Sequence, residues 1–390
     1  LLMEERRCAH AGKSDMIGFE RDIEFRQGHV PSTTKPVSLP YELRTEMTWI
    51  DFCHPLNPLG APKEILSAMH TALVDGELSY APDPAGHALR DALAQRFGIS
   101  SDSFLVGTSP SELIRSAAQA FCPCRVGVVA PAPSEYALAV ENAGHEHVDL
   151  INPVSFATVD AYTARTQAGD FEGVVLANPA YPSSRLLTRS TLVHYLETCN
   201  WVVVDESYIE LSFGGESMVP LVADYPNLVV VRNPSVTYAM PGVPISYTVA
   251  NPLTIKEIKR FHDGTGSTMF AEVLAKLIVG QQGYLEDTHD FLDKEIPWMQ
   301  CMLSLIPGIG IHPAEGNFVL CEFSPAEGMR LGVTCAEELV VRLQLSGFLV
   351  RRLDDVPGLD SQNYFCVAVR TRQENQRLLD ALRGIVSSAD

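Results

Sequence analysis

The sequence predicts an α/β protein in which a large domain holds a mostly parallel central sheet covered by helices, and a smaller C-terminal α/β domain follows. Two observations support this fold class. Apolar runs rich in valine, such as "GVVLANPA" and "WVVVDES", alternate along the chain with segments of helical periodicity. These runs lack the alternation of polar and apolar residues that half-exposed strands show, as expected when helices cover both faces of a parallel sheet.

The elements can be assigned in order from residue 62. The segments "PKEILSAMHTAL" (62–73) and "PAGHALRDALAQRFG" (84–98) both begin at a proline and carry apolar residues at helical spacing. A helix then begins near Ser109. After it come the strand "VGVVAP", the helix "SEYALAVENAG", the strand "GVVLANPA", the helix "RSTLVHYLETC", and the strands "WVVVDES", "NLVVVRNP" and 245–250.

We expect three parts along the chain. Residues 1–50 are polar and weakly periodic, which is typical of an arm or a docking segment. Residues 51–283 form the large domain and residues 284–390 the small one. The small domain should contain the strands "NFVLCEF", "FLVRRL" and "YFCVAVR", a helix near 334–346, and a last helix that begins with a capping box from Thr371 to Glu374.

Composition excludes several classes of function. The 390 residues carry a net charge of −19 and contain no basic run, so nucleic acid and anionic membranes are poor partners. No apolar stretch reaches the roughly 18 residues that span a bilayer, and the start lacks the apolar core of a signal peptide, so we expect a cytoplasmic protein. The motif "HEH" at 145–147 should lie in a surface turn without a third ligand, and we expect no metal site.

Several phrases occur together in a fixed order: "DFCHPLNPLGAPKEI", "YAPDPAGHALRDALAQRFGI", "GTSPSELI", "VVVDESYIE", "ESMVPLVADYPNLVVVRNPS", "AMPG" and "VAVRTRQENQRLLDALR". In this order and spacing, the chain after residue 50 resembles the fold-type-I pyridoxal-phosphate proteins of the class I and II aminotransferase superfamily. Within them it is most similar to the threonine-phosphate decarboxylases and histidinol-phosphate aminotransferases. The resemblance implies a homodimer with ligand sites at the carboxyl ends of the strands.

The resemblance also implies roles for individual residues. Asp205 matches the aspartate that keeps the cofactor's ring nitrogen protonated, and Tyr208 matches a site tyrosine three residues later. Arg370 and Arg351 match arginines that hold a substrate's carboxylate or phosphate. Tyr80 matches a tyrosine that reaches the neighbouring subunit's cofactor phosphate. Further candidates for contact with substrate, near the carboxyl ends of strands, are Asn178 and Tyr238.

Other positions depart from the family pattern. The Schiff-base lysine is replaced by Val236, and the arginine eight residues later, which clamps the cofactor phosphate, by Pro244. A phosphate-binding serine is replaced by Asn233, and the asparagine that contacts the ring hydroxyl by Tyr181. The glycine-rich phosphate turn reads Ser109, Pro110, Ser111, and a proline has no N–H to donate. These changes predict that no cofactor is used, or that pyridoxal phosphate binds only weakly or non-covalently.

Two functions remain open. The first is a cofactor-independent enzyme of specialised biosynthesis that acts on an amino-acid-like or phosphorylated carboxylate, with Asp205, Tyr208, Tyr181 and His54 as acid–base groups. The second is a non-catalytic subunit that completes the site of a lysine-containing paralogue, with Tyr80 as the donated residue. The first is favoured because unpaired, inward-facing arginines would be costly in a purely structural protein. Internal pairing, for example of Arg351 with Asp354, would remove that argument.

Overall fold

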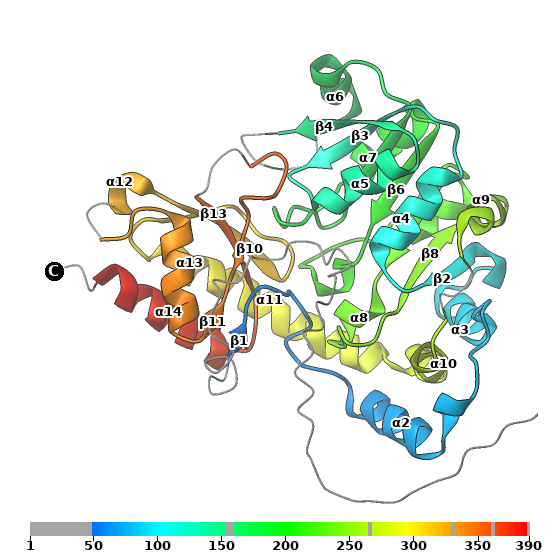
Figure 1. Cartoon of the computed structure of the whole chain (residues 1–390), viewed down its shortest axis with the longest axis horizontal. Coiled ribbons are helices and arrows are strands. Elements are labelled where there is room, and N and C mark those ends of the chain that lie inside the picture. The colour runs from blue at the N-terminus through cyan, green and yellow to red at the C-terminus, as the bar shows by residue number, and fades with distance from the viewer. Residues whose placement is uncertain are drawn as a thin grey trace, which may run out of the picture. The chain divides into compact units, whose positions relative to one another are not determined.

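The computed structural model describes residues 49–152, 156, 160–263, 267–328, 332–359 and 363–387. They confirm the α/β fold class (Figure 1). The predicted arm, 1–50, lies outside the described residues except for its last two. The division into 51–283 and 284–390 stays a prediction, although the two main sheets fall on either side of residue 284.

The larger sheet has seven strands in the order β2-β8-β7-β6-β5-β3-β4. Its strands are β2 (Phe104–Gly107), β3 (Arg125–Ala130), β4 (Glu146–Ile151), β5 (Gly173–Ala177), β6 (Trp201–Asp205), β7 (Leu228–Arg232) and β8 (Ser246–Ala250). The pairs from β4 to β7 are parallel, while β8 runs antiparallel to both β7 and β2. The carboxyl ends of β5 and β6 therefore meet at one edge of the sheet.

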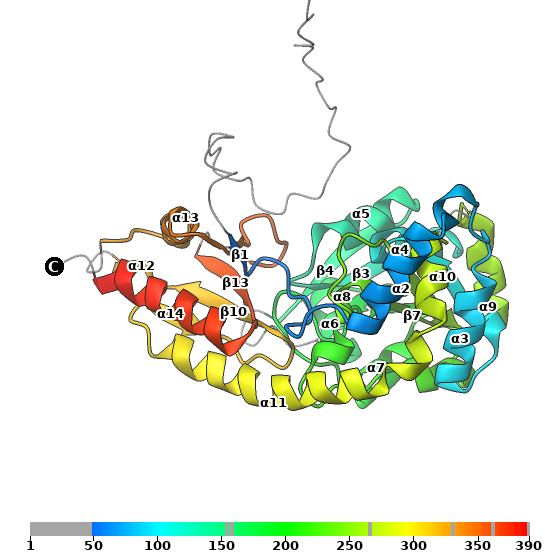
Figure 2. The same cartoon turned by 90° about the horizontal axis from the view of Figure 1, so that it is seen from below.

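Helices cover both faces of this sheet, as the apolar strands predict (Figure 2). Along β6, Val202 and Val204 pack into the apolar cluster of one face and Val203 into that of the other. One face is covered by α4 (Pro110–Gln119), α5 (Ser134–Asn142) and α9 (Pro252–Ile258). The opposite face is covered by α2 (Lys63–Val74), α3 (His87–Phe97), α6 (Ala161–Ala168), α7 (Arg189–Thr198) and α10 (Met269–Ala275).

The smaller sheet has four strands in the order β12-β13-β10-β9, all antiparallel. They are β9 (Ile309–Ile311), β10 (Phe318–Phe323), β12 (Arg351–Arg352) and β13 (Tyr364–Ala368). Around them lie α11 (Gln282–Ser304), α12 (Pro325–Gly328), α13 (Ala336–Leu345) and α14 (Arg372–Ser387). The short strand β1 (Ile50–Asp51) pairs in parallel with β11 (Phe348–Leu349), which places the segment after it beside the small sheet.

The "HEH" segment differs from the expected surface turn. Glu146 begins strand β4, which pairs along its whole length with β3. His145 is buried, and its ring contacts the backbone carbonyl of Ala118 and the backbone N–H of Cys124. These contacts give His145 a structural role. The described residues contain no group of three or more His, Cys, Asp or Glu side chains suited to a metal ion.

No helix within the described part of the chain is both long and apolar enough to cross a bilayer.

An apolar cluster packs between the small sheet and the helices α11, α13 and α14, and substitutions in α11 test this packing. Leu303, near the end of α11, is fully buried, whereas Leu305 is 65% exposed. We expect Leu303→Ala to lower the free energy of unfolding by about 2–5 kcal/mol, because it removes apolar contacts and leaves a cavity. Leu305→Ala should change it by less than about 0.5 kcal/mol. Urea unfolding measures both, and equal effects would contradict the assignment of Leu303 to the core.

Candidate active site

An open cavity of about 210 Å³ lies at the carboxyl end of β6, between the large sheet and β12. It brings together all four predicted catalytic residues and three of the altered cofactor positions. Its lining includes His54, Tyr181, Asp205, Tyr208, Arg351, Pro110, Ser111 and Asn233. These residues gather because β5 and β6 are parallel neighbours, and loops that leave parallel strands at the same edge meet there.

Asp205, the last residue of β6, forms the floor of this cavity and is only 6% exposed. Its Oδ2 accepts a hydrogen bond of 2.6 Å from the Tyr136 hydroxyl, and its Oδ1 accepts hydrogen bonds from the backbone N–H and the hydroxyl of Ser207. Burial raises the pKa of the Asp205 carboxyl, while the hydrogen bonds from Ser207 and Tyr136 act in the opposite direction. No cation forms an ion pair with Asp205 among the described residues.

Two tyrosines form one wall of the cavity. The rings of Tyr181 and Tyr208 stack with centroids 5.9 Å apart, and both pack against Phe318 of β10. Burial raises the pKa of both hydroxyls, and nearby groups such as Cys366 add to the effect. Both tyrosines therefore stay neutral near neutral pH, where they can donate hydrogen bonds but cannot act as bases.

The two predicted anion-binding arginines are paired inside the protein. Arg351 lines the cavity, but its Nη2 lies 3.2 Å from both carboxylate oxygens of Asp355. Arg370 is not among the cavity's lining residues. Its guanidinium donates to Glu374 and to the backbone carbonyl of Asp51. Pairing of both arginines removes the argument that unpaired charges must face a substrate, although Arg351 remains beside the cavity.

His54 stands at the rim of the cavity. Its Nδ1 lies 2.7 Å from Oδ2 of Asp51, and about half of its side chain is exposed. The hydrogen bond with Asp51 raises the pKa of His54, and burial opposes this only in part. A histidine whose pKa lies above its usual value can hold or release a proton close to neutral pH.

The remaining altered cofactor positions lie outside the cavity lining. Val236, in the short helix α8 (Pro234–Thr237), is buried in the apolar cluster that also contains Phe52 and Leu211. Pro244 is exposed. Ser109 is the N-cap of α4, and its side chain accepts from the backbone N–H of Glu112. No lysine is among the lining residues of the cavity.

The other predicted contact residues are also placed elsewhere. Asn178 is fully buried. Its side-chain amide donates a hydrogen bond to the backbone carbonyl of Glu216 and accepts one from the backbone N–H of Leu187. The hydroxyl of buried Tyr238 accepts a hydrogen bond from Arg96. Tyr80 is 76% exposed. Its role as a residue donated to a second subunit stays a prediction.

Sequence reasoning missed seven residues that line the cavity: Cys53, Pro55, Pro133, Glu135, Tyr136, Ser207 and Val356. Tyr136 matters most because it binds the Asp205 carboxylate directly. Its position offered a usable signal, since it lies in the first turn of α5, which follows the buried strand β3 at the same edge of the sheet as Asp205. Burial, followed by the charge of neighbouring Asp51, raises the pKa of the Cys53 thiol to about 12, so this cysteine is an inert thiol near neutral pH.

A buried group of charges, here called the Arg232 network, lies directly behind the cavity. Arg232 ends β7, and its guanidinium pairs with Glu206 at 3.0 Å and with Glu210 at 3.1 Å. Glu210 also pairs with Arg96 at 3.2 Å. Glu206 accepts further hydrogen bonds from the Ser217 hydroxyl and the Met218 backbone N–H. Burial opposes the charge on Arg232, but Glu206 and Glu210 outweigh it and raise the pKa of the guanidinium.

Comparison with known proteins agrees with this architecture. The family model "Aminotransferase class I and II" matches residues 48–382. The histidinol-phosphate aminotransferase of Thermoanaerobacter pseudethanolicus is 26% identical over 84% of this chain and 91% of its own length. The solved L-threonine-O-3-phosphate decarboxylase of Porphyromonas gingivalis superposes with a TM-score of 0.76 at 23% identity, over 87% of this chain and 99% of that one.

The expectation that no cofactor is used is wrong. The family match and the named relatives indicate pyridoxal phosphate rather than its absence. A solved histidinol-phosphate aminotransferase of Sinorhizobium meliloti, in complex with pyridoxal-5′-phosphate, superposes with a TM-score of 0.74 at 19% identity, over 90% of this chain and 94% of that one. The expectation gave too much weight to altered phosphate contacts and too little to Asp205, which remains buried at the cavity floor.

The pair of His54 and Asp51 predicts a measurable titration. We expect Asp51→Asn to lower the pKa of His54 toward its usual value of about 6.5, because the charged partner is lost. Since the pKa of His54 is raised in the folded state, the pair stabilises the protein below the pKa of the unfolded state. That stability is lost as pH rises through the folded value. NMR titration of the His54 ring measures the shift, and an unchanged pKa in Asp51→Asn would contradict it.

The Arg232 network predicts a large effect on stability. Arg232→Met leaves Glu206 and Glu210 without their buried cation, and we expect a loss of about 3–5 kcal/mol in the free energy of unfolding. Arg260→Met removes an exposed ion pair with Glu257 and should cost less than about 1 kcal/mol. Chemical denaturation compares the two variants. A loss in Arg232→Met no larger than in the control would mean that the network contributes little.

Proposed function

Because the chain belongs to the family of class I and II aminotransferases, we propose that its cavity binds pyridoxal phosphate through Asp205 rather than through a lysine. We further propose that the chain is an enzyme acting on a small amino-acid-like compound that carries a carboxylate or a phosphate. The names of relatives such as histidinol-phosphate aminotransferase and L-threonine-O-3-phosphate decarboxylase support a phosphorylated small molecule as the class of substrate.

The observation that carries this proposal is the unpaired charge of Asp205. A carboxylate can accept about four hydrogen bonds. The described residues supply three, from Tyr136 and from the N–H and hydroxyl of Ser207. A buried carboxylate without a cation is costly. A protonated pyridine nitrogen would supply both the missing hydrogen bond and the missing positive charge, so the cavity floor fits the ring end of this cofactor.

Other lining residues offer weaker contacts for a phosphate. Ser111 lies in the first turn of α4, where backbone N–H groups lack helical partners and favour an anion. Asn233, the N-cap of α8, also lines the cavity. Val236 packs among apolar side chains, so the protein supplies no amine at that position. Asp205 and the side chains that line the cavity would then supply most of the contacts that bind the cofactor.

The roles of five lining residues follow from their chemistry. When bound, pyridoxal phosphate supplies an electron sink, and Asp205 holds its ring nitrogen in the protonated state. Arg351, although paired with Asp355, lies beside the cavity and can orient a substrate's anionic group. Tyr181 and Tyr208 exclude water from one side and donate hydrogen bonds. His54 is the lining group suited to move a proton near neutral pH, because Asp51 holds its Nδ1 in place.

A second candidate function is a subunit that completes the site of a lysine-containing relative. The surface around Tyr80 favours it, since three apolar or aromatic side chains are largely exposed there: Val74 at the end of α2, Leu78 in the short helix Glu77–Ser79, and Tyr80 directly after that helix. Exposed apolar patches mark interaction sites. A mixture with such a relative would then give a stable hetero-oligomer in sedimentation velocity, and Tyr80→Ala would weaken it. A stable homodimer that does not exchange subunits would exclude this function.

Binding of pyridoxal phosphate tests the main proposal without an assay of activity. In calorimetric titration we expect saturable binding by the natural protein and an affinity about tenfold or more lower in Asp205→Asn, because hydrogen bonds to a charged group contribute about 1.5–3 kcal/mol. Asp170→Asn removes an exposed charge far from the cavity lining and is the matched control. Equal affinities in all three proteins, or no saturable binding by the natural one, would refute the role of Asp205.

A further inference from the structure

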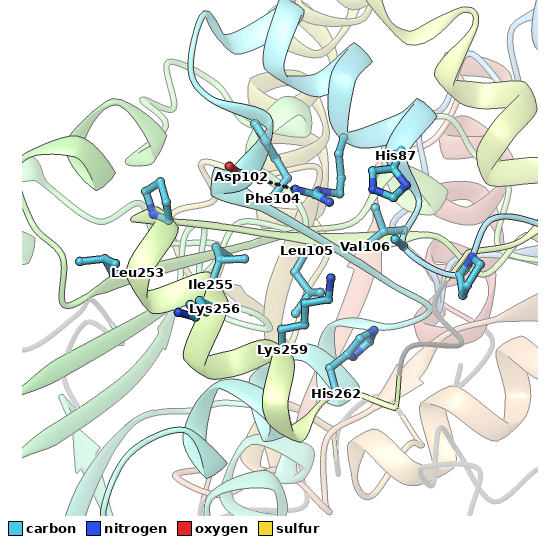
Figure 3. A pocket seen from close by; sticks show the side chains of 14 residues that line it. His87, Asp102, Phe104, Leu105, Val106, Leu253, Ile255, Lys256, Lys259 and His262 are labelled. Atoms are coloured by element: carbon cyan, nitrogen blue, oxygen red, sulfur yellow. Dashed lines mark hydrogen bonds and ion pairs between the residues drawn. The ribbon is translucent and has the colours of Figure 1, made fainter.

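A second cavity, of about 550 Å³, shares no lining residue with the candidate active site. It lies at the edge of the large sheet, where β2 meets the start of α3, the short 3-10 helix at Ser101–Ser103, and the segment from α9 to His262 (Figure 3). Its volume falls in the range of about 300–1,000 Å³ that is usual for sites of small molecules. The cavity beside Asp205 is smaller than that range.

Basic side chains dominate the charge of this second cavity. Its described lining contains one acid, Asp102, against Arg90, Lys256, Lys259, His87 and His262. Arg90 pairs with Asp102 and with the backbone of Ser101. Lys256 and Lys259, from α9 and the turn that follows it, are exposed and form no ion pair with any described residue. The chain as a whole has a net charge of −19, but the positive charge concentrated at this cavity favours binding of an anion there.

His262 supplies an independent sign of a missing partner. Its side chain is only 2% exposed, yet neither ring nitrogen makes a hydrogen bond with any described residue. Its Nδ1 lies 3.3 Å from Oε1 of Glu112, whose other oxygen, Oε2, accepts hydrogen bonds from the backbone N–H and the hydroxyl of Thr108. The second ring nitrogen, Nε2, has no partner at all among the described residues. A buried polar group without a hydrogen bond is costly and uncommon. A ligand that reaches His262 in this cavity would satisfy it.

The rest of the cavity is apolar. Phe104, Leu105 and Val106 of β2 and Ile255 of α9 are buried beneath it, and Leu253 is largely exposed at its rim. Figure 3 shows Lys256 and Lys259 projecting from the same helical segment that carries Leu253 and Ile255. A bare inorganic anion would leave the exposed side chain of Leu253 in water. A ligand with an apolar body and one anionic group matches both parts of the cavity.

We propose that this cavity is a second ligand site, which takes a small organic anion with an apolar or aromatic body. The anionic group contacts Lys256, Lys259 and His262, and the body covers the side chains of β2 and α9. The site is independent of the proposed function, because none of its residues lines the cavity beside Asp205.

Anilinonaphthalene sulfonate, which combines an aromatic body with a sulfonate, is a suitable fluorescent probe. We expect saturable binding by the full-length natural protein and a Kd about tenfold higher in the double variant Lys256→Gln with Lys259→Gln, because two charged contacts are lost. The double variant Lys276→Gln with Lys294→Gln removes the same charge elsewhere and should bind as the natural protein does. Ionic strength is held constant, since salt screens exposed charges.

A displacement experiment tests the apolar part of the site. Decanoate should displace the probe at concentrations at which inorganic phosphate does not, because phosphate has no apolar body. The proposal is overturned if both double variants bind the probe alike, if the natural protein shows no saturable binding, or if phosphate displaces the probe as well as decanoate does.

Discussion

The candidate active site depends on how the Arg232 network is buried. Four side chains with formal charge, those of Arg232, Glu206, Glu210 and Arg96, lie together behind the carboxyl ends of β6 and β7. Such a group is tolerated only when every charge is paired and hydrogen-bonded. Because Glu206 is also held by Ser217 and Met218, the chain that leaves β6 has little freedom. The network therefore fixes the positions of the residues on either side of Glu206.

Asp205 and Glu206 show how adjacent acids take different roles. Successive side chains at the end of a strand point to opposite faces. Glu206 consequently turns toward Arg232, while Asp205 turns toward the cavity, where Tyr136 and Ser207 bind it but no described cation does. Burial raises the pKa of both carboxyls, and for Glu206 the charge of Arg232 opposes this rise. The charge of Glu206 is thereby balanced by Arg232 within the protein, whereas Asp205 remains available to bind a ligand.

The sequence was informative where a side chain's position follows from the topology of the sheet. Asp205, Tyr208 and Tyr181 follow neighbouring parallel strands, so their meeting at one edge could be predicted. The pairing of Arg370 with Glu374 could not be predicted, because a charge pattern does not say whether an arginine faces a ligand or an acid in the helix that follows it. The cofactor was misjudged because the altered phosphate contacts, taken together, were given more weight than the buried Asp205. Burial of His145 was missed because "HEH" is polar, whereas the ring is held by backbone groups of Ala118 and Cys124.

The two cavities differ in what each leaves unsatisfied, and this difference indicates the charge of what each would bind. Beside Asp205 the unpaired group is a buried carboxylate, which attracts a cationic ring nitrogen. In the second cavity the groups without partners among the described residues are the ammonium groups of Lys256 and Lys259 and the buried Nε2 of His262, which favour an anion. A protein selected only for its fold would gain stability by replacing either group with an apolar side chain, since burying polar groups without partners costs free energy. Retention of both is therefore better explained by binding than by folding.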